Sequence, residues 1–75
     1  MDIFDEILEK IYNFEMKNNG NSPTWIFINH GHYNKIRVSP KYQSYVQIDL
    51  ETGKPKTIFG MNYQIKKDIK DITVQ

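Results

Sequence analysis

Two histidines separated by one glycine, His30-Gly31-His32, are the part of this sequence most typical of a chemical site. In an extended segment, side chains two positions apart point the same way, so the two imidazoles could bind one Zn²⁺ or Ni²⁺. A metal site needs at least a third ligand, and the chain contains no cysteine. That ligand would have to be Asp49, Glu51 or a residue of a second copy, and the spacing selects none of them. The simpler interpretation is a polar turn after a buried strand, so we predict no metal and no cofactor.

Other catalytic patterns are weak. The serines Ser22, Ser39 and Ser44 lie in turn-like contexts, without the flanking glycines of a nucleophile elbow. The four glycines are spread along the chain, so they form no phosphate-binding loop. The carboxylates cluster near the N-terminus, where a helix dipole and solvent explain them. A chain of 75 residues also leaves little room for a sheltered pocket of about 300 Å³ or more. We therefore predict that the protein is not an enzyme.

Basic and aromatic residues are interleaved from position 33 onward, in a pattern that can stack bases and neutralise phosphates. Only one arginine is present, however, and residues 23–75 carry eight bases and four acids, a net charge of +4 that is small for a nucleic-acid-binding surface. The tyrosines could equally be strand residues. Binding of a nucleic acid or nucleotide is therefore the alternative function, and its candidate residues are Tyr33, Lys35, Arg37, Lys41 and Tyr42.

Charge divides the chain into two segments. Residues 1–22 contain five acids and two bases, for a net charge of −3, so the overall net charge of +1 conceals an acidic N-terminal segment. The usual explanation of such a segment is a solvated helix face. The alternative is that this acidic face, which includes Glu6 and Glu9, meets a partner of opposite charge.

Large aromatic residues are more numerous than a small helix-and-sheet domain can easily bury. Core packing is the simplest explanation of them. The alternative is an exposed aromatic patch that binds a partner or a second copy of the chain, because Tyr and Trp are common anchors of interfaces. Together with the acidic helix face, these residues give the partner-binding candidates Glu6, Glu9, Trp25, Tyr45 and Tyr63.

The elements that must position these side chains follow from the spacing of apolar residues. Near the N-terminus they recur at helical spacing, at Phe4, Ile7, Leu8, Ile11 and Phe14. Asp2 is a suitable N-cap, so we predict a helix over residues 2–18. Gly20 and Pro23 end that helix. Asn29 could cap a second, short helical turn.

Strands are predicted where β-branched and aromatic residues lie between turn residues. Residues 24–29 are apolar on both faces, which is typical of a central strand. Residues 44–50 alternate between apolar and polar, and residues 56–59 and 61–66 continue the pattern, with a hairpin turn at Gly53 and a bulge or bend at Gly60. The tail, residues 68–74, fits either a helical turn or a strand.

These elements predict a single α+β domain over residues 1–75. We expect one N-terminal helix packed on a three- to four-stranded, mainly antiparallel sheet. Since no disulfide can form, self-association is a plausible source of further stability. The longest apolar run, Trp25-Ile26-Phe27-Ile28, is far too short to cross a membrane, and the acidic N-terminus is unlike a secretory signal. We therefore predict a cytoplasmic protein without a membrane partner.

The order of these features is similar to that of a known family. A helix is followed by the segment Pro23-Thr24-Trp25-Ile26-Phe27-Ile28-Asn29, then by a Gly53-Lys54-Pro55 turn and by Thr57-Ile58-Phe59-Gly60-Met61-Asn62-Tyr63-Gln64-Ile65. Residues 4–66 thereby resemble a segment of tailed-phage major capsid proteins, in which a helix precedes a Trp-hydrophobic-Met/Ile-Asn strand and a later Leu-x-Gly-hydrophobic-Pro-Val strand. The chain also resembles small phage and prophage proteins of unassigned role.

The resemblance to the capsid segment has limits that bear on function. Asn62 stands where the capsid pattern usually has proline, and the chain is far too short for a capsid subunit. The resemblance therefore implies a phage-type origin and a related α+β topology, and it does not imply a shell. The function we predict is non-enzymatic docking on a protein partner, with steric occlusion as the mechanism. On the resemblance, that partner would be a host or defence factor to be inhibited, or a virion component to be modulated.

Overall fold

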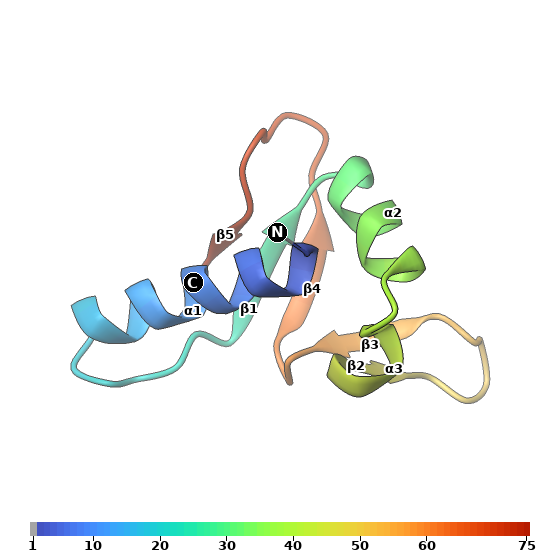
Figure 1. Cartoon of the computed structure of the whole chain (residues 1–75), viewed down its shortest axis with the longest axis horizontal. Helices are drawn as coiled ribbons and strands as arrows, with labels where there is room; N and C mark the ends of the chain where they lie inside the picture. The colour runs from blue at the N-terminus through green and yellow to red at the C-terminus, as the bar shows by residue number, and fades with distance from the viewer. Residues whose placement is uncertain (1) are drawn as a thin grey trace.

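Residues 2–75 are described by the computed structural model, and within them the chain forms three helices and five strands (Figure 1). The α+β fold class is thereby confirmed. The helices are α1 (Ile3–Lys17), α2 (His30–Val38) and α3 (Tyr42–Tyr45). The strands are β1 (Trp25–Ile28), β2 (Val46–Ile48), β3 (Pro55–Ile58), β4 (Asn62–Ile65) and β5 (Thr73–Val74).

The N-terminal helix α1 begins and ends within one residue of the predicted limits, because local signals fix both ends. The Asp2 carboxylate accepts a hydrogen bond of 3.0 Å from the Phe4 N–H, as an N-cap does. That hydrogen bond lowers the pKa of Asp2, and a 3.0 Å hydrogen bond from the Ser39 hydroxyl lowers it further. After the helix, Gly20 adopts a φ of 83°, which favours glycine. Of the helices in residues 2–75, none combines the length and the apolar character that crossing a bilayer requires.

The central strand β1 lies between β4 and β5 in a three-stranded sheet. The prediction of mainly antiparallel pairing holds for β1 with β5 and for β2 with β3, whereas β1 and β4 are parallel. The chain passes through α2, α3 and the β2–β3 hairpin before it returns as β4. Parallel neighbours need such a long crossover, and local sequence patterns do not reveal which strands it will join.

A second, two-stranded sheet is formed by β2 and β3, so the predicted single sheet is replaced by two. The strand predicted over residues 44–50 is also shorter, because its first part is the helical turn α3. This turn begins after Ser39, whose hydroxyl accepts a hydrogen bond from the Lys41 N–H at 3.1 Å and whose carbonyl accepts one from the Tyr42 N–H at 3.1 Å.

A two-residue turn, Phe59-Gly60, joins the two sheets. Both residues have positive φ, 51° and 76°. Ile58 and Met61 exchange two backbone hydrogen bonds across the turn, at 3.0 and 2.9 Å. Positive φ at both central positions is the signature of a type I′ turn, so β3 and β4 are held close together at this point.

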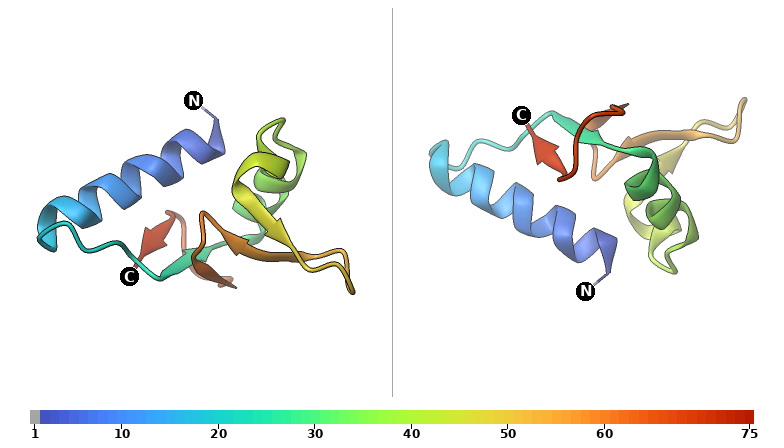
Figure 2. Two further views of the ribbon diagram at one scale, coloured as in Figure 1. Left: turned by 90° about the horizontal axis from the view of Figure 1, so that it is seen from below. Right: turned by 90° about the horizontal axis from the view of Figure 1, so that it is seen from above.

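The core lies between α1 and one face of the three-stranded sheet, and α2 and the β3–β4 turn close its end (Figures 1 and 2). The tail contributes through Ile72, which precedes β5, so the ambiguous segment 68–74 ends as a strand. In both views of Figure 2, no helix covers the other face of the sheet. The most deeply buried side chains are Phe4, Ile7, Ile26, Ile28, Ile36, Ile58 and Ile72.

Candidate functional site

The two histidines lie on the first turn of α2, so the extended conformation that a shared metal would need is not present. On a helix, residues two positions apart point about 200° away from each other. His32 instead completes a capping box: its Nδ1 accepts a hydrogen bond from the Asn29 N–H at 3.1 Å, and its own N–H donates to Asn29 Oδ1 at 2.8 Å. Within residues 2–75, no three His, Asp or Glu side chains gather in a group that could hold a metal ion. His30 and His32 therefore form part of the first turn of helix α2.

The residues proposed for nucleic-acid binding are mostly engaged in the fold. Tyr33 stacks on Tyr63 with ring centroids 6.2 Å apart, and the Arg37 guanidinium lies 5.8 Å from the Tyr33 ring. The Lys41 ammonium is 3.3 Å from the Asp5 carboxylate. Tyr42 packs against the core, and Lys35 is exposed on α2. The structure brings Tyr33 and Arg37 together, and Tyr33 and Tyr42 are both half-buried.

The three aromatic residues proposed as one partner-binding patch lie in three different places. Trp25 is on the uncovered face of the sheet and is 42% exposed. Tyr45 lies against Phe59 and beside Phe4 in the first turn of α1. Tyr63 is directly opposite Ile26 in the β1–β4 register, so it faces inward, on the side where Ile26 is buried. The structure does not bring the three residues into one patch. Trp25 and Tyr63 point to opposite faces of the sheet, because side chains alternate between the two faces of a strand, and Tyr45 lies in α3, outside that sheet.

Tyr63 is held by interactions within the domain. Its hydroxyl donates a 2.8 Å hydrogen bond to the Pro55 carbonyl in β3. Burial disfavours the charged phenolate and raises the pKa of Tyr63, and the neighbouring Tyr33 raises it further. Tyr63 therefore ties β4 to β3 and leaves little of its ring for a partner.

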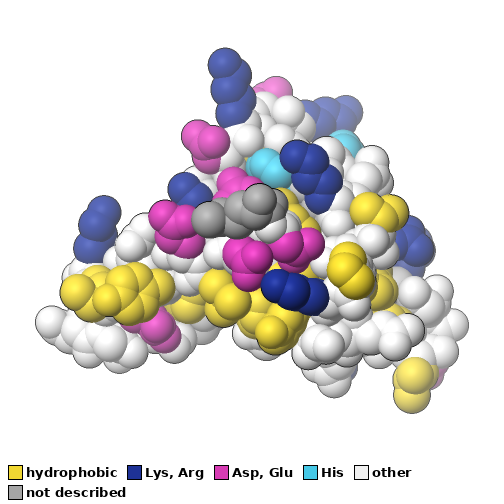
Figure 3. Space-filling model, viewed as in Figure 1, with side chains coloured by type: hydrophobic (Ala, Val, Ile, Leu, Met, Phe, Trp, Pro, Cys, Tyr) yellow, Lys and Arg dark blue, Asp and Glu magenta, His cyan; other side chains and the backbone are white. Residues whose placement is uncertain are grey.

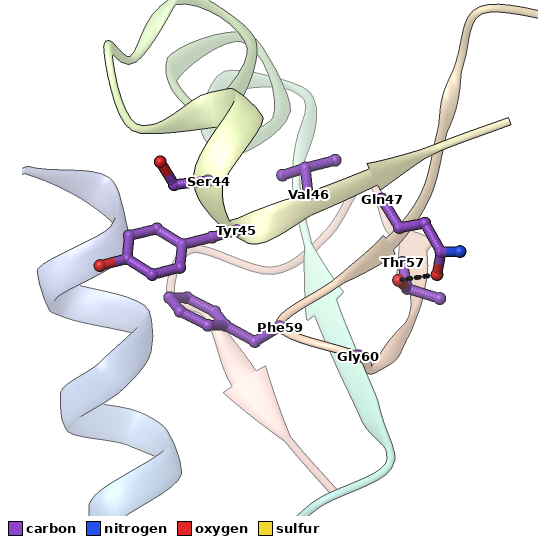
Figure 4. A pocket seen from close by; sticks show the side chains of 7 residues that line it. All are labelled: Ser44, Tyr45, Val46, Gln47, Thr57, Phe59 and Gly60. Atoms are coloured by element: carbon purple, nitrogen blue, oxygen red, sulfur yellow. Dashed lines mark hydrogen bonds between the residues drawn. The ribbon is translucent and has the colours of Figure 1, made fainter. Parts of the chain in front are cut away.

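Tyr45 and Phe59 form the wall of a surface hollow of about 450 Å³ (Figure 4). Their ring centroids are 4.6 Å apart, and each lies within 6 Å of the buried Phe4 ring. The hollow is open to solvent, so it is not the sheltered pocket that the sequence analysis considered. The lining contains no carboxylate and no imidazole, so it suits an uncharged group better than acid–base chemistry. The other residues that line the hollow are Ser44, Val46, Gln47, Thr57 and Gly60.

An apolar stripe on α1 is exposed, and of its three residues only Leu8 belongs to the apolar spacing from which the helix was predicted. Leu8, Tyr12 and Met16 are 43%, 61% and 69% exposed. They follow one another at intervals of four residues, which places them on one face of the helix. We call these three residues the docking stripe. The sequence shows only that the apolar residues of α1 span a wider arc than one core contact needs, and the packing decides which part of that arc stays exposed.

One acidic residue borders the docking stripe. Glu9 is exposed one turn before Tyr12, whereas Glu6, two residues before Leu8, is half-buried and points away from the stripe. In Figure 3, hydrophobic side chains form a band over α1, and acidic side chains gather beside it. The structure thus brings the predicted acidic helix face together with an exposed apolar surface.

A second exposed surface is the uncovered face of the three-stranded sheet. Trp25 and Phe27 both point to this face, and their rings are nearly parallel, with an interplanar angle of 8° and centroids 6.3 Å apart. Beside them is a hollow of about 290 Å³. This surface contains only one residue, Trp25, from the predicted candidates.

Comparisons of the chain with models of protein families, with curated proteins and with solved structures gave no match. The resemblance of residues 4–66 to a capsid segment stays a prediction.

Proposed function

We propose that this protein is a non-enzymatic binding module that docks on a protein partner through the docking stripe of α1. The observation that carries the proposal is the exposure of Leu8, Tyr12 and Met16 on one helix face. Single exposed apolar residues are common, but a row of three large ones on a helix is typical of an interaction surface.

The chemistry of the stripe indicates the kind of partner. Apolar residues at intervals of four on a helix are the anchors of helix-in-groove recognition. Tyr is a frequent hot-spot residue, and the flexible Met side chain adapts to irregular pockets. The carboxylate of Glu9 borders these anchors, and Glu6 adds negative charge to the same helix. The partner we propose is therefore a protein with an apolar groove bordered by Lys or Arg.

The rigid attachment of α1 suggests how binding would act. Asp2 caps the helix, and the buried side chains of Phe4 and Ile7 anchor it in the core. A helix that is already ordered loses little conformational entropy on docking. The rest of the domain would then cover the partner's groove and exclude competing ligands. On the capsid-segment resemblance, we propose that this occlusion acts in the host cytoplasm on a host or defence factor or on a virion component.

Affinity capture with matched variants tests the proposal. Wild-type protein is immobilised and exposed to a lysate of cells in which the gene is expressed. The stripe variant Tyr12→Ala/Met16→Ala is compared with the control Asn13→Ala/Lys17→Ala, which changes exposed positions elsewhere on α1. Circular dichroism shows that each variant is folded. We expect a protein that the wild type and the control retain and the stripe variant loses.

The captured protein is then purified, and its dissociation constant is measured against each variant. Loss of a hot-spot Tyr costs about 2 kcal/mol or more, so we expect Tyr12→Ala to weaken binding by about 30-fold. Glu6→Gln/Glu9→Gln should weaken it less and reduce its dependence on salt. Identical capture by wild type and stripe variant would contradict the proposal. A wild-type dimer that Tyr12→Ala/Met16→Ala converts to monomer would also contradict it, because the stripe would then bind a second copy.

A further inference from the structure

The uncovered face of the three-stranded sheet is arranged as columns of side chains, with aromatic rings in the middle column. Residues directly opposite each other in paired strands point to the same face. Trp25 is opposite Asn62, and Phe27 lies between Gln64 on one side and Thr73 on the other. Their neighbours Ile26 and Ile28 are fully buried on the other face, beneath α1 (Figure 2). We call this surface the outer sheet face, which consists of Trp25, Phe27, Asn62, Gln64, Lys66, Thr73 and Gln75.

The aromatic column suits flat ligands. The Trp25 and Phe27 rings have parallel planes, so two flat rings could stack on them in the same orientation. The hollow beside the rings is lined also by Gln64 and Gln75. Each amide side chain offers both hydrogen-bond donors and an acceptor, which is the combination that the edges of nucleobases require.

Charge on this face favours an anionic ligand. The Lys66 ammonium lies over the face of the Phe27 ring, 4.3 Å from its centre, so a base that stacks on that face would displace it toward the edge, where it can meet a phosphate. Lys67 and Lys70 are exposed in the connection that leads from β4 to β5. No carboxylate side chain belongs to the outer sheet face, whereas Glu6 and Glu9 lie on α1, on the opposite side of the sheet. Asp68 and Asp71 reduce the net charge of the connection, so affinity should depend mainly on stacking.

We propose that the outer sheet face binds single-stranded nucleic acid, with bases stacked on Trp25 and Phe27 and phosphates near Lys66. Aromatic rings on an open sheet face with basic residues at its edge are a general solution for binding single strands without strong sequence preference. This surface differs from the one predicted on α2 and α3. It also shares no residue with the docking stripe, so the two proposals succeed or fail separately.

Fluorescence of Trp25 gives a direct test, because it is the single tryptophan of the sequence. Purified full-length protein is titrated with a twelve-residue oligodeoxythymidylate at 50 mM salt. We expect saturable quenching with a dissociation constant between about 10⁻⁴ and 10⁻⁶ M. Phe27→Ala should weaken binding by about 5- to 150-fold, the range for the loss of one stacked base.

Surface variants locate the binding site even if Phe27→Ala fails to fold. Lys66→Gln should weaken binding and reduce the slope of log K against log salt by about 0.7, the contribution of one phosphate contact to a single strand. The matched control Lys35→Gln/Arg37→Gln changes two exposed cations of α2 and should leave binding unchanged. Tyr12→Ala should also have no effect.

Four outcomes would overturn the proposal. One is the absence of saturable quenching. Another is binding that Lys35→Gln/Arg37→Gln abolishes and Lys66→Gln does not change, which would place the nucleic acid on α2. A third is quenching by a neutral oligosaccharide such as maltohexaose with no response to the oligonucleotide. The last is a shift of Trp25 emission with protein concentration alone, which would show that a second copy covers the face.

Discussion

Tyr63 illustrates how a residue that the sequence offers to a partner can be used inside the domain. Its ring stacks on Tyr33, and its hydroxyl donates to the Pro55 carbonyl. Trp25 points to the opposite face, although it directly precedes Ile26, the residue paired with Tyr63 between β1 and β4. Residue type alone therefore does not separate a structural tyrosine from an interface anchor.

We predict that Tyr63→Phe lowers the free energy of unfolding by about 1 kcal/mol, the usual net value of one hydrogen bond. The raised pKa of Tyr63 adds a dependence on pH. The folded state holds the proton of the Tyr63 hydroxyl more tightly than the unfolded state. The stability that this hydroxyl contributes is therefore fully present below pH 10, near the pKa of an unfolded Tyr. It is lost as pH rises through the higher folded value.

Urea unfolding between pH 8 and 11 checks this prediction, with Tyr12→Phe as the control because Tyr12 is 61% exposed. The loss of stability above pH 10 should be smaller in Tyr63→Phe than in wild type, and unchanged in the control. If the two variants have equal stability, Tyr63 does not tie β4 to β3 as described. Partner binding should be unchanged in Tyr63→Phe.

At the scale of elements, the Phe59-Gly60 turn decides how the two sheets meet. Phe59 is a bulky residue with positive φ, a conformation that costs free energy and needs support from its surroundings. That support comes from its ring, which packs between Tyr45 and Phe4. Gly60 supplies the second positive φ without steric cost.

We predict that Gly60→Ala lowers the free energy of unfolding by about 1–2 kcal/mol, the cost of the left-handed conformation for a residue with a Cβ atom. A Cβ atom at this position would meet no heavy atom within 4 Å, so the loss comes from the backbone conformation alone. Gly60→Asn should lose less, since Asn tolerates this region. Chemical denaturation of both variants is the measurement. Equal losses would show that the backbone conformation does not set the cost.

At the scale of the whole molecule, the two sheets share one core. Ile58, at the end of β3, and Ile26, in the middle of β1, are both fully buried in the same cluster. Burial of this core therefore requires both the β2–β3 hairpin and the unit formed by α1 and the three-stranded sheet. A domain of this kind is expected to unfold in one cooperative step.

We predict that Ile58→Ala lowers stability by about 2–5 kcal/mol, as large-to-small changes in a core do. This is a large fraction of the roughly 4–11 kcal/mol typical of 75 residues. Trp25 fluorescence reports on β1, and far-ultraviolet circular dichroism reports on the helices, so their transitions should coincide in wild type and shift together in the variant. Val38→Ala is the control: it is 82% exposed and should change stability by less than about 0.5 kcal/mol. Transitions that separate would show that the main sheet and the helices do not unfold in one cooperative step.

The sequence by itself determined the features that depend on neighbouring residues. The Asp2 cap, the extent of α1, the start of α2 at Asn29 and the hairpin turn at Gly53 were predictable, because hydrogen bonds within a few residues and allowed φ values fix them. The strands were located approximately for the same reason, since alternation and β-branched content act locally. The acidic face of α1 was also visible, as charge is read directly from residue type.

Only the tertiary structure decided which surfaces remain open. The parallel pairing of β1 with β4 joins residues nearly forty positions apart, as in Trp25 with Asn62, and no local pattern encodes it. That pairing turns Trp25 and Phe27 outward and Tyr63 inward. The packing of α1 on its Ile3 and Ile7 side likewise leaves Leu8, Tyr12 and Met16 in solvent. Burial depends on which distant segments meet, so the docking stripe and the outer sheet face could be found only in the folded chain.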